Sequence, residues 1–231
     1  MARKPFKGSL VANVIENGVG GLNIEDCRVG NEHFKIEDGE YDNNETQACY
    51  GNIKGTPKEY NGRFPANIIT DGSKEVANGM PTENDVSAMR YFYCAKASKK
   101  DRDGGLDMFE EHAITDGRTK PIDNAFNRGE TKKHNIHPTV KPCELMQYLI
   151  RLVAPKGSVV MDCFMGSGST GKATMFENRE RNANYYFIGI EMTSEYLPIC
   201  KARIDYAINL EDYEARRLGA PISKQVNVFD D

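Results

Sequence analysis

The chain has 231 residues, which is enough for one ordinary domain with a real hydrophobic core. Its formal net charge of −4 excludes an overall positive field that would attract nucleic acid, so any contact with DNA has to come from local basic patches. With 39% hydrophobic and 28% charged residues, the composition predicts a soluble protein with long polar loops.

The cysteines are scattered, and none forms a C-x-x-C pair, so we expect no zinc or other metal site. Without a recognisable signal peptide, the thiols are predicted to be reduced, packed in the interior of a cytoplasmic protein. No apolar run approaches the roughly 20 residues that span a bilayer. The cysteines are Cys27, Cys49, Cys94, Cys143, Cys163 and Cys200.

The first half of the chain predicts few regular elements. Residues 1–7 indicate the end of a strand or a loop leading into the domain. Residues 31–50 carry six acids against one lysine among Gly, Asn and Asp, which is typical of a surface loop. The segment 62–69 is short and apolar, and 90–96 is aromatic and predicts a strand. Residues 98–136 are polar, and loops of that length are often functional.

The second half predicts alternating helices and strands. Apolar spacing indicates a helix over 142–153 and another after Ser194, which caps it, to about residue 210. Short apolar runs predict strands at 158–163 and 186–190 on either side of a helix over 169–178. This strand–helix–strand order predicts a parallel βαβ unit and therefore an α/β fold.

A glycine turn joins the first of these strands to its helix, in the run Asp162-Cys-Phe-Met-Gly-Ser-Gly-Ser-Thr170. Glycines there let the backbone turn sharply and approach a ligand closely. The turn also fits G-x-G-x-x-G, ending at Gly171, and Glu191 follows twenty residues later at the end of the next strand. Such an acid accepts hydrogen bonds from ribose hydroxyls, so a nucleotide-like ligand is expected, and NAD fits the spacing.

Two observations disfavour NAD. Only forty residues follow Glu191, which leaves little room for further strands. The carboxylate of Asp162 precedes the glycines, where it would repel a pyrophosphate. It suits a ligand with a positive charge or an amine, and S-adenosylmethionine carries both, together with a ribose.

A second motif, His137-Pro-Thr-Val-Lys-Pro142, precedes the glycine turn by some twenty residues. Its two prolines predict an extended approach to the helix that starts near Pro142. Thr139 and Lys141 then lie at the mouth of that helix, where the lysine could hold a carboxylate or phosphate. Taken alone, His137 is more typical of a packed or capping histidine.

These two motifs, followed by Ile188-Gly-Ile-Glu191, resemble the amino-group DNA methyltransferases of the permuted class, in which the cofactor half follows the catalytic half. The resemblance covers roughly residues 137–210. A weaker likeness to phage and bacterial members extends upstream, at 2–6, 20–24, 62–67 and 91–96. It implies a Rossmann-like fold, S-adenosylmethionine as cofactor, double-stranded DNA as substrate, and a bacterial or phage-infected cell. The methyl group would go to the exocyclic amine of adenine or cytosine, with adenine slightly favoured.

The resemblance also implies roles for individual residues. The glycine turn and Asp162 would surround the methionine end of the cofactor, Glu191 would bind its ribose, and the segment from His137 to Lys141 would close over it. The implied cofactor residues are His137, Thr139, Lys141, Asp162, Phe164, Gly166, Ser167, Gly168, Ser169, Thr170 and Glu191.

One feature of the family is missing. Its catalytic signature, a polar residue followed by Pro-Pro and an aromatic, holds the target amine and stacks on the flipped base. None of the ten prolines here is followed by another. We therefore expect the C-terminal part of a methyltransferase, with a fold that is incomplete at its N-terminus: a truncated chain, a split gene product or a decayed copy. A second chain could supply the catalytic part, and a homo-oligomer is the other possibility. A non-catalytic remnant that binds cofactor or DNA, and a fragment of a NAD-dependent oxidoreductase, are the alternatives.

Two basic stretches, 90–102 and 117–141, each have a net charge of +4 and are candidates for phosphate contacts. Solvated loops are the simpler interpretation of each. In domain terms, 1–135 would be the middle and target-recognition region, 136–210 the cofactor half, and 211–231 a tail. The candidate DNA-binding residues are Arg90, Lys96, Lys99, Lys100, Arg118, Lys132 and Lys133.

Overall fold

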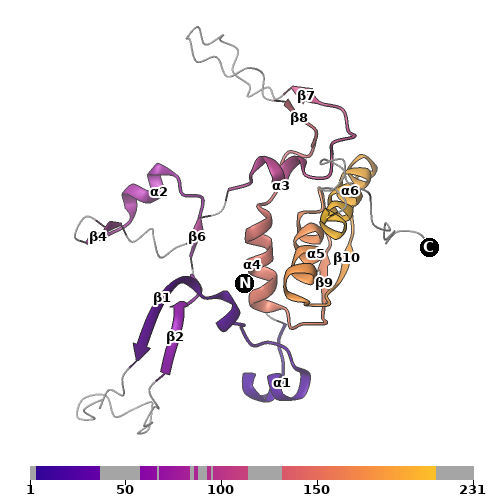
Figure 1. The fold of residues 1–231 in the computed structure, drawn as a ribbon. Coiled ribbons are helices and arrows are strands. Elements are labelled where there is room, and N and C mark those ends of the chain that lie inside the picture. Colours follow the sequence, from indigo (N-terminus) through magenta and orange to yellow (C-terminus); the bar gives the residue numbers. More distant parts are fainter. Residues whose placement is uncertain are drawn as a thin grey trace, which may run out of the picture.

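The structure is a computed structural model that describes residues 4–36, 58–66, 68–83, 86–87, 93–94, 96–113 and 132–211. Its main body consists of helices α4 (Cys143–Val153), α5 (Ser169–Arg181) and α6 (Leu197–Ile208) with strands β9 (Val159–Asp162) and β10 (Tyr186–Gly189) (Figure 1). The other elements are α1 (Leu10–Asn17), η1 (Glu25–Cys27), β1 (Val29–Ile36), β2 (Lys58–Arg63), β3 (Ile69–Thr70), α2 (Lys74–Gly79), β4 (Thr82–Glu83), β5 (Val86–Ser87), β6 (Tyr93–Cys94), α3 (Lys99–Asp103), β7 (His112–Ala113), β8 (Lys132–Lys133) and η3 (Ser194–Tyr196).

Strands β9 and β10 are parallel neighbours, with Val159 opposite Tyr186 and Asp162 opposite Gly189. Helix α5 connects them and packs against both. The predicted βαβ unit and the α/β fold class are therefore confirmed. Because the two strands run in the same direction and in register, their carboxyl ends lie at one edge, and the residues that follow each strand come together there.

The helix ends follow from local chemistry. Helix α4 has Glu144 in its first turn and Arg151 in its last, so both charges complement the helix dipole. Helix α5 lies between two left-handed residues, Gly168 at φ 74° and Asn182 at φ 51°. It extends three residues beyond the predicted end at 178. The predicted last helix begins as the 3-10 turn η3 and continues as α6.

The core of the body lies between α4, α5 and the segment that leads into β10. Cys143 and Ile150 from α4 pack with Ala173 and Tyr185. The carboxylate of Glu177, fully buried in α5, accepts hydrogen bonds from the Arg151 guanidinium at 2.5 and 3.1 Å and pairs with Arg181. Since a buried carboxylate is costly unless it is paired, this network fixes α4 against α5.

One face of the β9–β10 pair carries apolar side chains that remain exposed to solvent. Alternate residues along both strands, and the residue after β10, are 49% to 69% exposed. Parallel sheets are normally covered on both faces, so this face is unusual. The exposed residues are Val159, Met161, Tyr186, Ile188 and Ile190.

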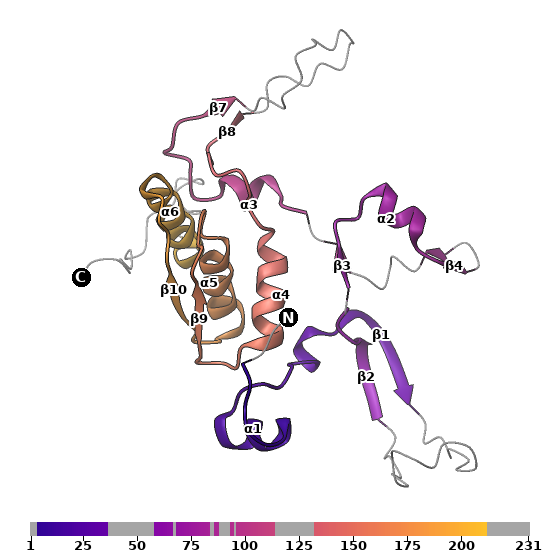
Figure 2. The same ribbon diagram turned by 180° about the vertical axis from the view of Figure 1, so that it is seen from behind.

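The N-terminal region extends from the body as an antiparallel hairpin of β1 and β2, with α1 and α2 nearby (Figures 1 and 2). It is joined to the body around η1. The amide of Asn23 donates to the Leu152 carbonyl at 2.9 Å, Asp26 pairs with Arg181, and the Tyr148 hydroxyl donates to a carbonyl at residue 66. None of the helices described is long and apolar enough to cross a membrane.

Several expectations for the first half were wrong. Helix α1 was not predicted, although Ser9 caps it. The proposed loop over 31–50 begins inside β1, and the proposed loop over 98–136 contains α3, β7 and β8. The strand over 90–96 is described only at β6. Among the cysteines, Cys27, Cys143 and Cys200 are buried as predicted, whereas Cys163 is exposed because it follows β9 at the open edge; Cys49 lies outside the described residues.

Candidate functional site

Asp162 is the last residue of β9 and organises the turn that follows it. One carboxylate oxygen accepts the backbone amide of Phe164 at 3.0 Å, and the other accepts the Thr170 hydroxyl at 2.5 Å. The side chain thus joins the start of the turn to the first residues of α5. A carboxylate has about four acceptor positions, so two remain for a ligand.

Glu191 follows β10 and reaches across to the same turn. Its Oε2 accepts the amide of Gly166 at 2.6 Å, and its Oε1 accepts the amide of Thr193 at 2.8 Å. These two backbone donors, that of Thr193 first, hold the pKa of Glu191 below its usual value. The group is therefore a carboxylate at neutral pH and can still accept two further hydrogen bonds, as a ribose diol would require.

The glycines of the turn are required by their surroundings. Gly166 has φ 53°, and a Cβ atom there would lie 2.6 Å from Nε2 of His137. Gly168 has φ 74°, and a Cβ atom there would lie 2.8 Å from the Cβ of Cys200 on α6. Gly171 lies against Ile204 in the same way. A ligand was expected to approach the backbone closely at Gly166, and on one side the His137 ring occupies that position.

His137 lies over the turn, with its imidazole ring against Gly166. Its ring meets the Tyr196 ring edge to face at 4.6 Å, and its Nδ1 is placed to accept the Thr139 amide at 3.3 Å. Burial lowers the pKa of His137, with Arg203 and Lys141 adding to the effect against an opposing influence of Glu191. The imidazole is therefore neutral at pH 7 and can donate or accept a hydrogen bond.

The remaining predicted cofactor residues divide into two groups. The side chains of Thr139 and Lys141 are exposed at the mouth of α4, whereas Ser167 and Ser169 are buried. The Ser169 hydroxyl accepts the amide of Lys141 at 3.3 Å, which ties the His137–Lys141 segment to the turn. The two serines thus face the protein interior, and a cofactor at this edge would meet their backbone.

Large apolar side chains border the two carboxylates. Phe164, two residues after β9, is 91% exposed, and Met192, three residues after β10, is 97% exposed. An aromatic ring and a thioether beside two carboxylates offer both surfaces that a nucleoside needs, one for the base and one for the sugar.

A separate cavity of about 390 Å³ lies between α3, α4 and α5. Lys172, Gln147 and Phe176 are among its lining residues, together with Lys96 and Lys100. It includes none of the residues predicted for the cofactor. Among the described residues no cluster of three His, Cys, Asp or Glu side chains could hold a metal ion.

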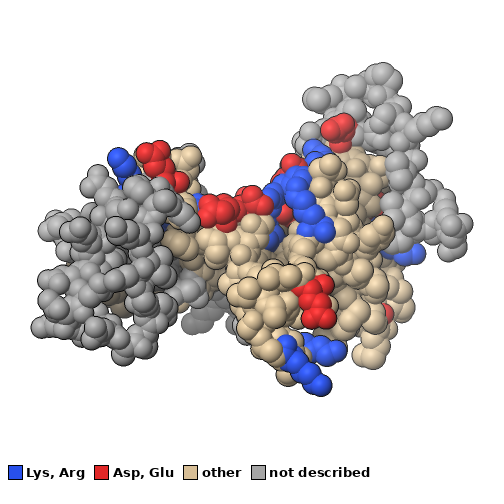
Figure 3. Space-filling model, turned by 90° about the horizontal axis from the view of Figure 1, so that it is seen from below, with Lys and Arg blue, Asp and Glu red and all other residues tan. Residues whose placement is uncertain are grey.

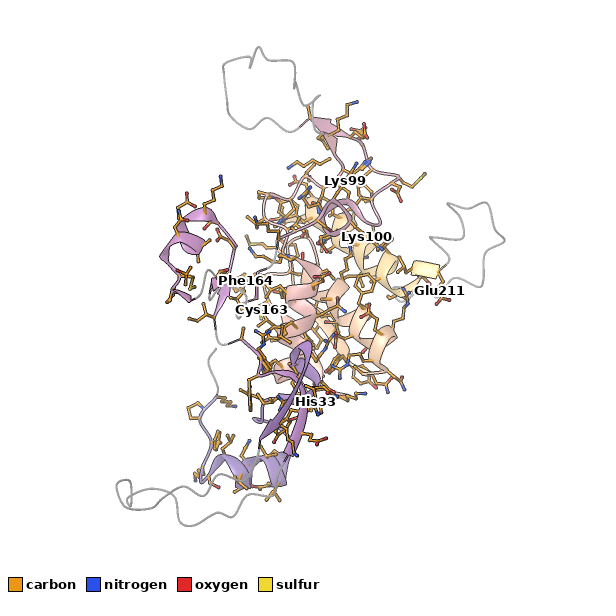
Figure 4. The ribbon with its side chains drawn as sticks, turned by 60° about the vertical axis from the view of Figure 1, so that its left-hand side comes forward. His33, Lys99, Lys100, Cys163, Phe164 and Glu211 are labelled. Atoms are coloured by element: carbon orange, nitrogen blue, oxygen red, sulfur yellow. The ribbon has the colours of Figure 1, made fainter. Side chains whose placement is uncertain are left out.

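The candidate DNA-binding lysines meet at one end of the body. Lys99 and Lys100 lie together on α3 (Figure 4), and Lys132 and Lys133 form β8. The carboxylate of Asp103 accepts the amide that follows β8 at 3.1 Å, which holds β8 beside α3. Lys132 also forms an ion pair with Glu111 at 3.3 Å. Lys96 is exposed just before α3; Arg90 and Arg118 lie outside the described residues.

The surface charge is mixed. On the face seen in Figure 3, lysine and arginine side chains are interspersed with acidic ones, so no broad basic field appears there. This agrees with the overall charge of −4. Phosphate contacts would depend on a few individual lysines.

Two buried cations near the turn were not predicted. Lys172 in α5 is 1% exposed and Arg203 in α6 is 0% exposed. The sequence contained a signal for Arg203, which falls among the apolar residues Ile199, Cys200 and Ile204 on the buried stripe of its helix. Lys172 had no such signal, because most of the buried residues of α5 are polar. A cation on such a stripe has to be bonded to buried acceptors.

Comparison with known proteins agrees with this geometry. A family model described as DNA methylase, of the N6 and N4 methyltransferases, matches residues 37–202. The type II methyltransferase M.BglI of Bacillus subtilis is 34% identical over 87 residues, which is 38% of this chain and 23% of the relative. M.XycI of Xanthomonas campestris pv. cyanopsidis is 30% identical over 115 residues, covering 50% and 32%. The DNA adenine methyltransferase YhdJ of Escherichia coli K12 is 38% identical over 71 residues, covering 31% and 22%.

Among solved structures, the cytosine-N4-specific PvuII DNA methyltransferase is 30% identical with a TM-score of 0.25, covering 29% of this chain and 22% of that one. The M1.HpyAVI–SAM complex is 28% identical with a TM-score of 0.26, covering 42% and 45%. The chain thus spans 22% to 32% of the length of these three curated relatives. Since the family model matches more than half of the residues, and its range includes the β9–α5–β10 unit with both edge carboxylates, the chain belongs to the N6/N4 DNA methylase family.

Proposed function

We propose that this chain binds S-adenosylmethionine across the carboxyl ends of β9 and β10 and serves the methylation of an exocyclic amino group in double-stranded DNA. The observation that carries the proposal is the pair of ionisable carboxylates, Asp162 and Glu191, on either side of one glycine turn. Asp162 is already oriented by one backbone amide and the Thr170 hydroxyl, and Glu191 by two backbone amides, so a ligand would meet a preformed site.

The residues at this edge suit the chemistry of that cofactor. Glu191 has free acceptor positions for a ribose diol, and Asp162 has them for the amino group of the methionine end. Phe164 offers an apolar face beside them, and neutral His137 covers the turn. The bound cofactor would supply an electrophilic methyl group on a sulfonium centre. Two fixed carboxylates favour such a cation and disfavour the pyrophosphate of NAD.

The DNA side of the proposal rests on the lysines of α3 and β8, which would bind phosphates next to the target base. The cofactor would supply its methyl group to the amine of a base flipped out of the duplex, and that amine would give up a proton. No enzyme nucleophile takes part, so exposed Cys163 has no catalytic role. Adenine and cytosine both occur as targets in the names of the relatives, and we propose one of these two amines.

We further propose that the part of the methyltransferase that carries the Pro-Pro-aromatic motif covers the exposed face of the β9–β10 pair. Five apolar residues on that face, including Met161 and Ile188, support a complementary apolar partner. Light scattering measures the oligomeric state of the wild type and of Met161→Lys, and so tests whether a second copy of this chain covers the face. A dimer of this chain that dissociates in the variant would contradict the proposal in favour of a second copy.

Calorimetric titration tests the cofactor proposal. The wild-type chain is titrated with S-adenosylmethionine and, as a control ligand, with NAD. Asp162→Asn and Glu191→Gln are compared with Glu195→Gln, an exposed carboxylate in η3 that serves as the matched control.

We expect selective binding of S-adenosylmethionine and a loss of about tenfold or more in affinity for each site variant, because each loses a charged hydrogen-bond acceptor. The control should bind like the wild type. Equal affinity for NAD, or unaltered affinity after Asp162→Asn, would contradict the assignment. A folded chain that binds neither ligand would favour a remnant that has lost cofactor binding, or a half-site that forms only with its missing part.

A further inference from the structure

The carboxyl end of the short helix α3 is anchored by three buried side chains from other elements. Lys172 of α5 donates to the Lys100 carbonyl at 3.1 Å, and Arg203 of α6 donates to the Asp101 carbonyl at 2.5 Å. Asn135 donates to the carbonyl of the next residue, 102, at 2.9 Å. The carbonyls in the last turn of a helix lack the full set of helical partners. Here the Lys100 carbonyl also accepts the Gly104 amide at 3.0 Å, and the three side chains supply further donors to it and to the next two carbonyls.

Arg203 continues from α3 to the glycine turn. Its Nη1 donates to the Ser167 carbonyl, and both Nη atoms lie 3.4 to 3.5 Å from the Ser169 hydroxyl. Asn135 makes a parallel link, because its Oδ1 accepts the amide of His137 at 2.9 Å. The helix that carries the candidate phosphate-binding lysines is thereby connected to the turn and to the segment above it.

Burying the Arg203 guanidinium at this position costs folding free energy. It is fully buried, its Nε has no hydrogen-bond partner, and within the described residues it makes no ion pair with a carboxylate. Burial lowers the pKa of Arg203 to about 10, with Asp101, Asp103 and two thiols opposing the effect, so it remains charged at neutral pH. An apolar residue would fill the same space at lower cost. A planar fork with donors on two sides gives what an apolar residue cannot, a fixed separation between two carbonyls.

We infer that Arg203 is a positioning residue for the cofactor site: it sets the orientation of the 166–168 turn by joining the Ser167 carbonyl to the end of α3. This inference rests on the proposed function, since the turn is the proposed binding site. Arg203 itself does not touch the ligand. It acts through the Gly166 amide, whose bond to Glu191 depends on how the turn is oriented.

Arg203→Lys is the test variant, because it keeps the charge and loses the fork. Arg151→Lys is the matched control. That arginine also binds buried acceptors on α5, but those belong to Glu177, away from the turn. Two quantities are measured: the affinity for S-adenosylmethionine by calorimetry, and hydrogen exchange of peptides covering residues 163–169.

We expect Arg203→Lys to bind the cofactor about tenfold more weakly and to exchange faster within 163–169. Arg151→Lys should lower the melting temperature and leave both readouts unchanged, so a general loss of stability is distinguished from mispositioning. Should Arg203→Lys not fold, Ser169→Ala removes the hydroxyl that the fork contacts and is predicted to act in the same direction, more weakly.

The possible results separate the inference from the function on which it rests. Wild-type affinity in a folded Arg203→Lys variant overturns the inference and leaves the proposed function intact. Unchanged exchange at 163–169 also overturns it, whether or not the cofactor binds. Failure of the wild type to bind S-adenosylmethionine overturns the proposed function, and with it the role assigned to Arg203.

Discussion

Gly166→Ala probes the contact between the glycine turn and His137, and Gly157→Ala provides its matched control. Both glycines have positive φ, 53° and 79°. An alanine in the left-handed region costs about 1 kcal/mol at either position. At Gly157 nothing lies within 4 Å of the added Cβ, so this cost should be the whole effect.

At Gly166 the added Cβ would lie 2.6 Å from Nε2 of His137, so the ring has to move. Movement gives up its contacts with Tyr196 and with the Thr139 amide. Overpacking of this kind costs a further 1 to 3 kcal/mol or so. The total loss of unfolding free energy at Gly166 is therefore predicted to be about 2 to 4 kcal/mol, against about 1 kcal/mol at Gly157.

Urea denaturation followed by circular dichroism measures both losses. The His137→Ala background makes the steric part separable, since the added methyl group then has room and the excess over Gly157→Ala should disappear. An equal cost for the two glycine variants in the wild-type background would refute the reasoning. So would an excess at Gly166 that persists without the imidazole ring.

Three further predictions concern charge. The depressed pKa of Glu191 stabilises the fold above the usual value of 4.5, so the stability difference between wild type and Glu191→Gln should shrink as pH falls below 4.5 in an acid denaturation series. A constant difference would contradict this. Burial lowers the pKa of Lys172 from 10.5 to about 8, so the unfolded chain holds more protons between these values. Wild type should therefore gain up to about 3 kcal/mol relative to Lys172→Met as pH rises through that window, measured by urea denaturation, and parallel curves would exclude it. The affinity for duplex DNA can be measured by fluorescence anisotropy as a function of salt concentration. Replacing Lys99 and Lys100 by Gln should reduce the slope of log affinity against log salt by the equivalent of about two phosphate contacts. Lys156→Gln, whose lysine contacts the last residue of α5, should leave that slope unchanged.

The second half of the chain was predictable because its signals are local. Apolar runs, two glycines and the carboxylates at 162 and 191 lie within one βαβ unit. Their spacing alone places Asp162 and Glu191 at the ends of neighbouring strands. The structure confirms that placement and adds that Glu191 binds the Gly166 amide.

Helix α3 shows why the rest was harder to predict. Its capping box, Ser98 with Asp101, is visible in the sequence, but five residues without an apolar stripe predict nothing by periodicity. The helix is stabilised by side chains from distant parts of the sequence. Lys172 donates to the Lys100 carbonyl, 72 residues away, and Arg203 donates to the Asp101 carbonyl, 102 residues away. Contacts of that range have no signature in a local pattern. Helix α1 was missed for a different reason: it is only eight residues long, and glycines follow it at 18, 20 and 21.

The location of the cofactor can be tested by amide chemical-shift mapping of the isotope-labelled chain titrated with S-adenosylmethionine. Binding across the carboxyl ends of β9 and β10 predicts the largest shifts at the amides of Phe164, Gly166 and Thr193, because the first donates to Asp162 and the other two donate to Glu191. Shifts confined to the residues around the cavity of about 390 Å³ between α3, α4 and α5, with these three amides unmoved, would contradict it.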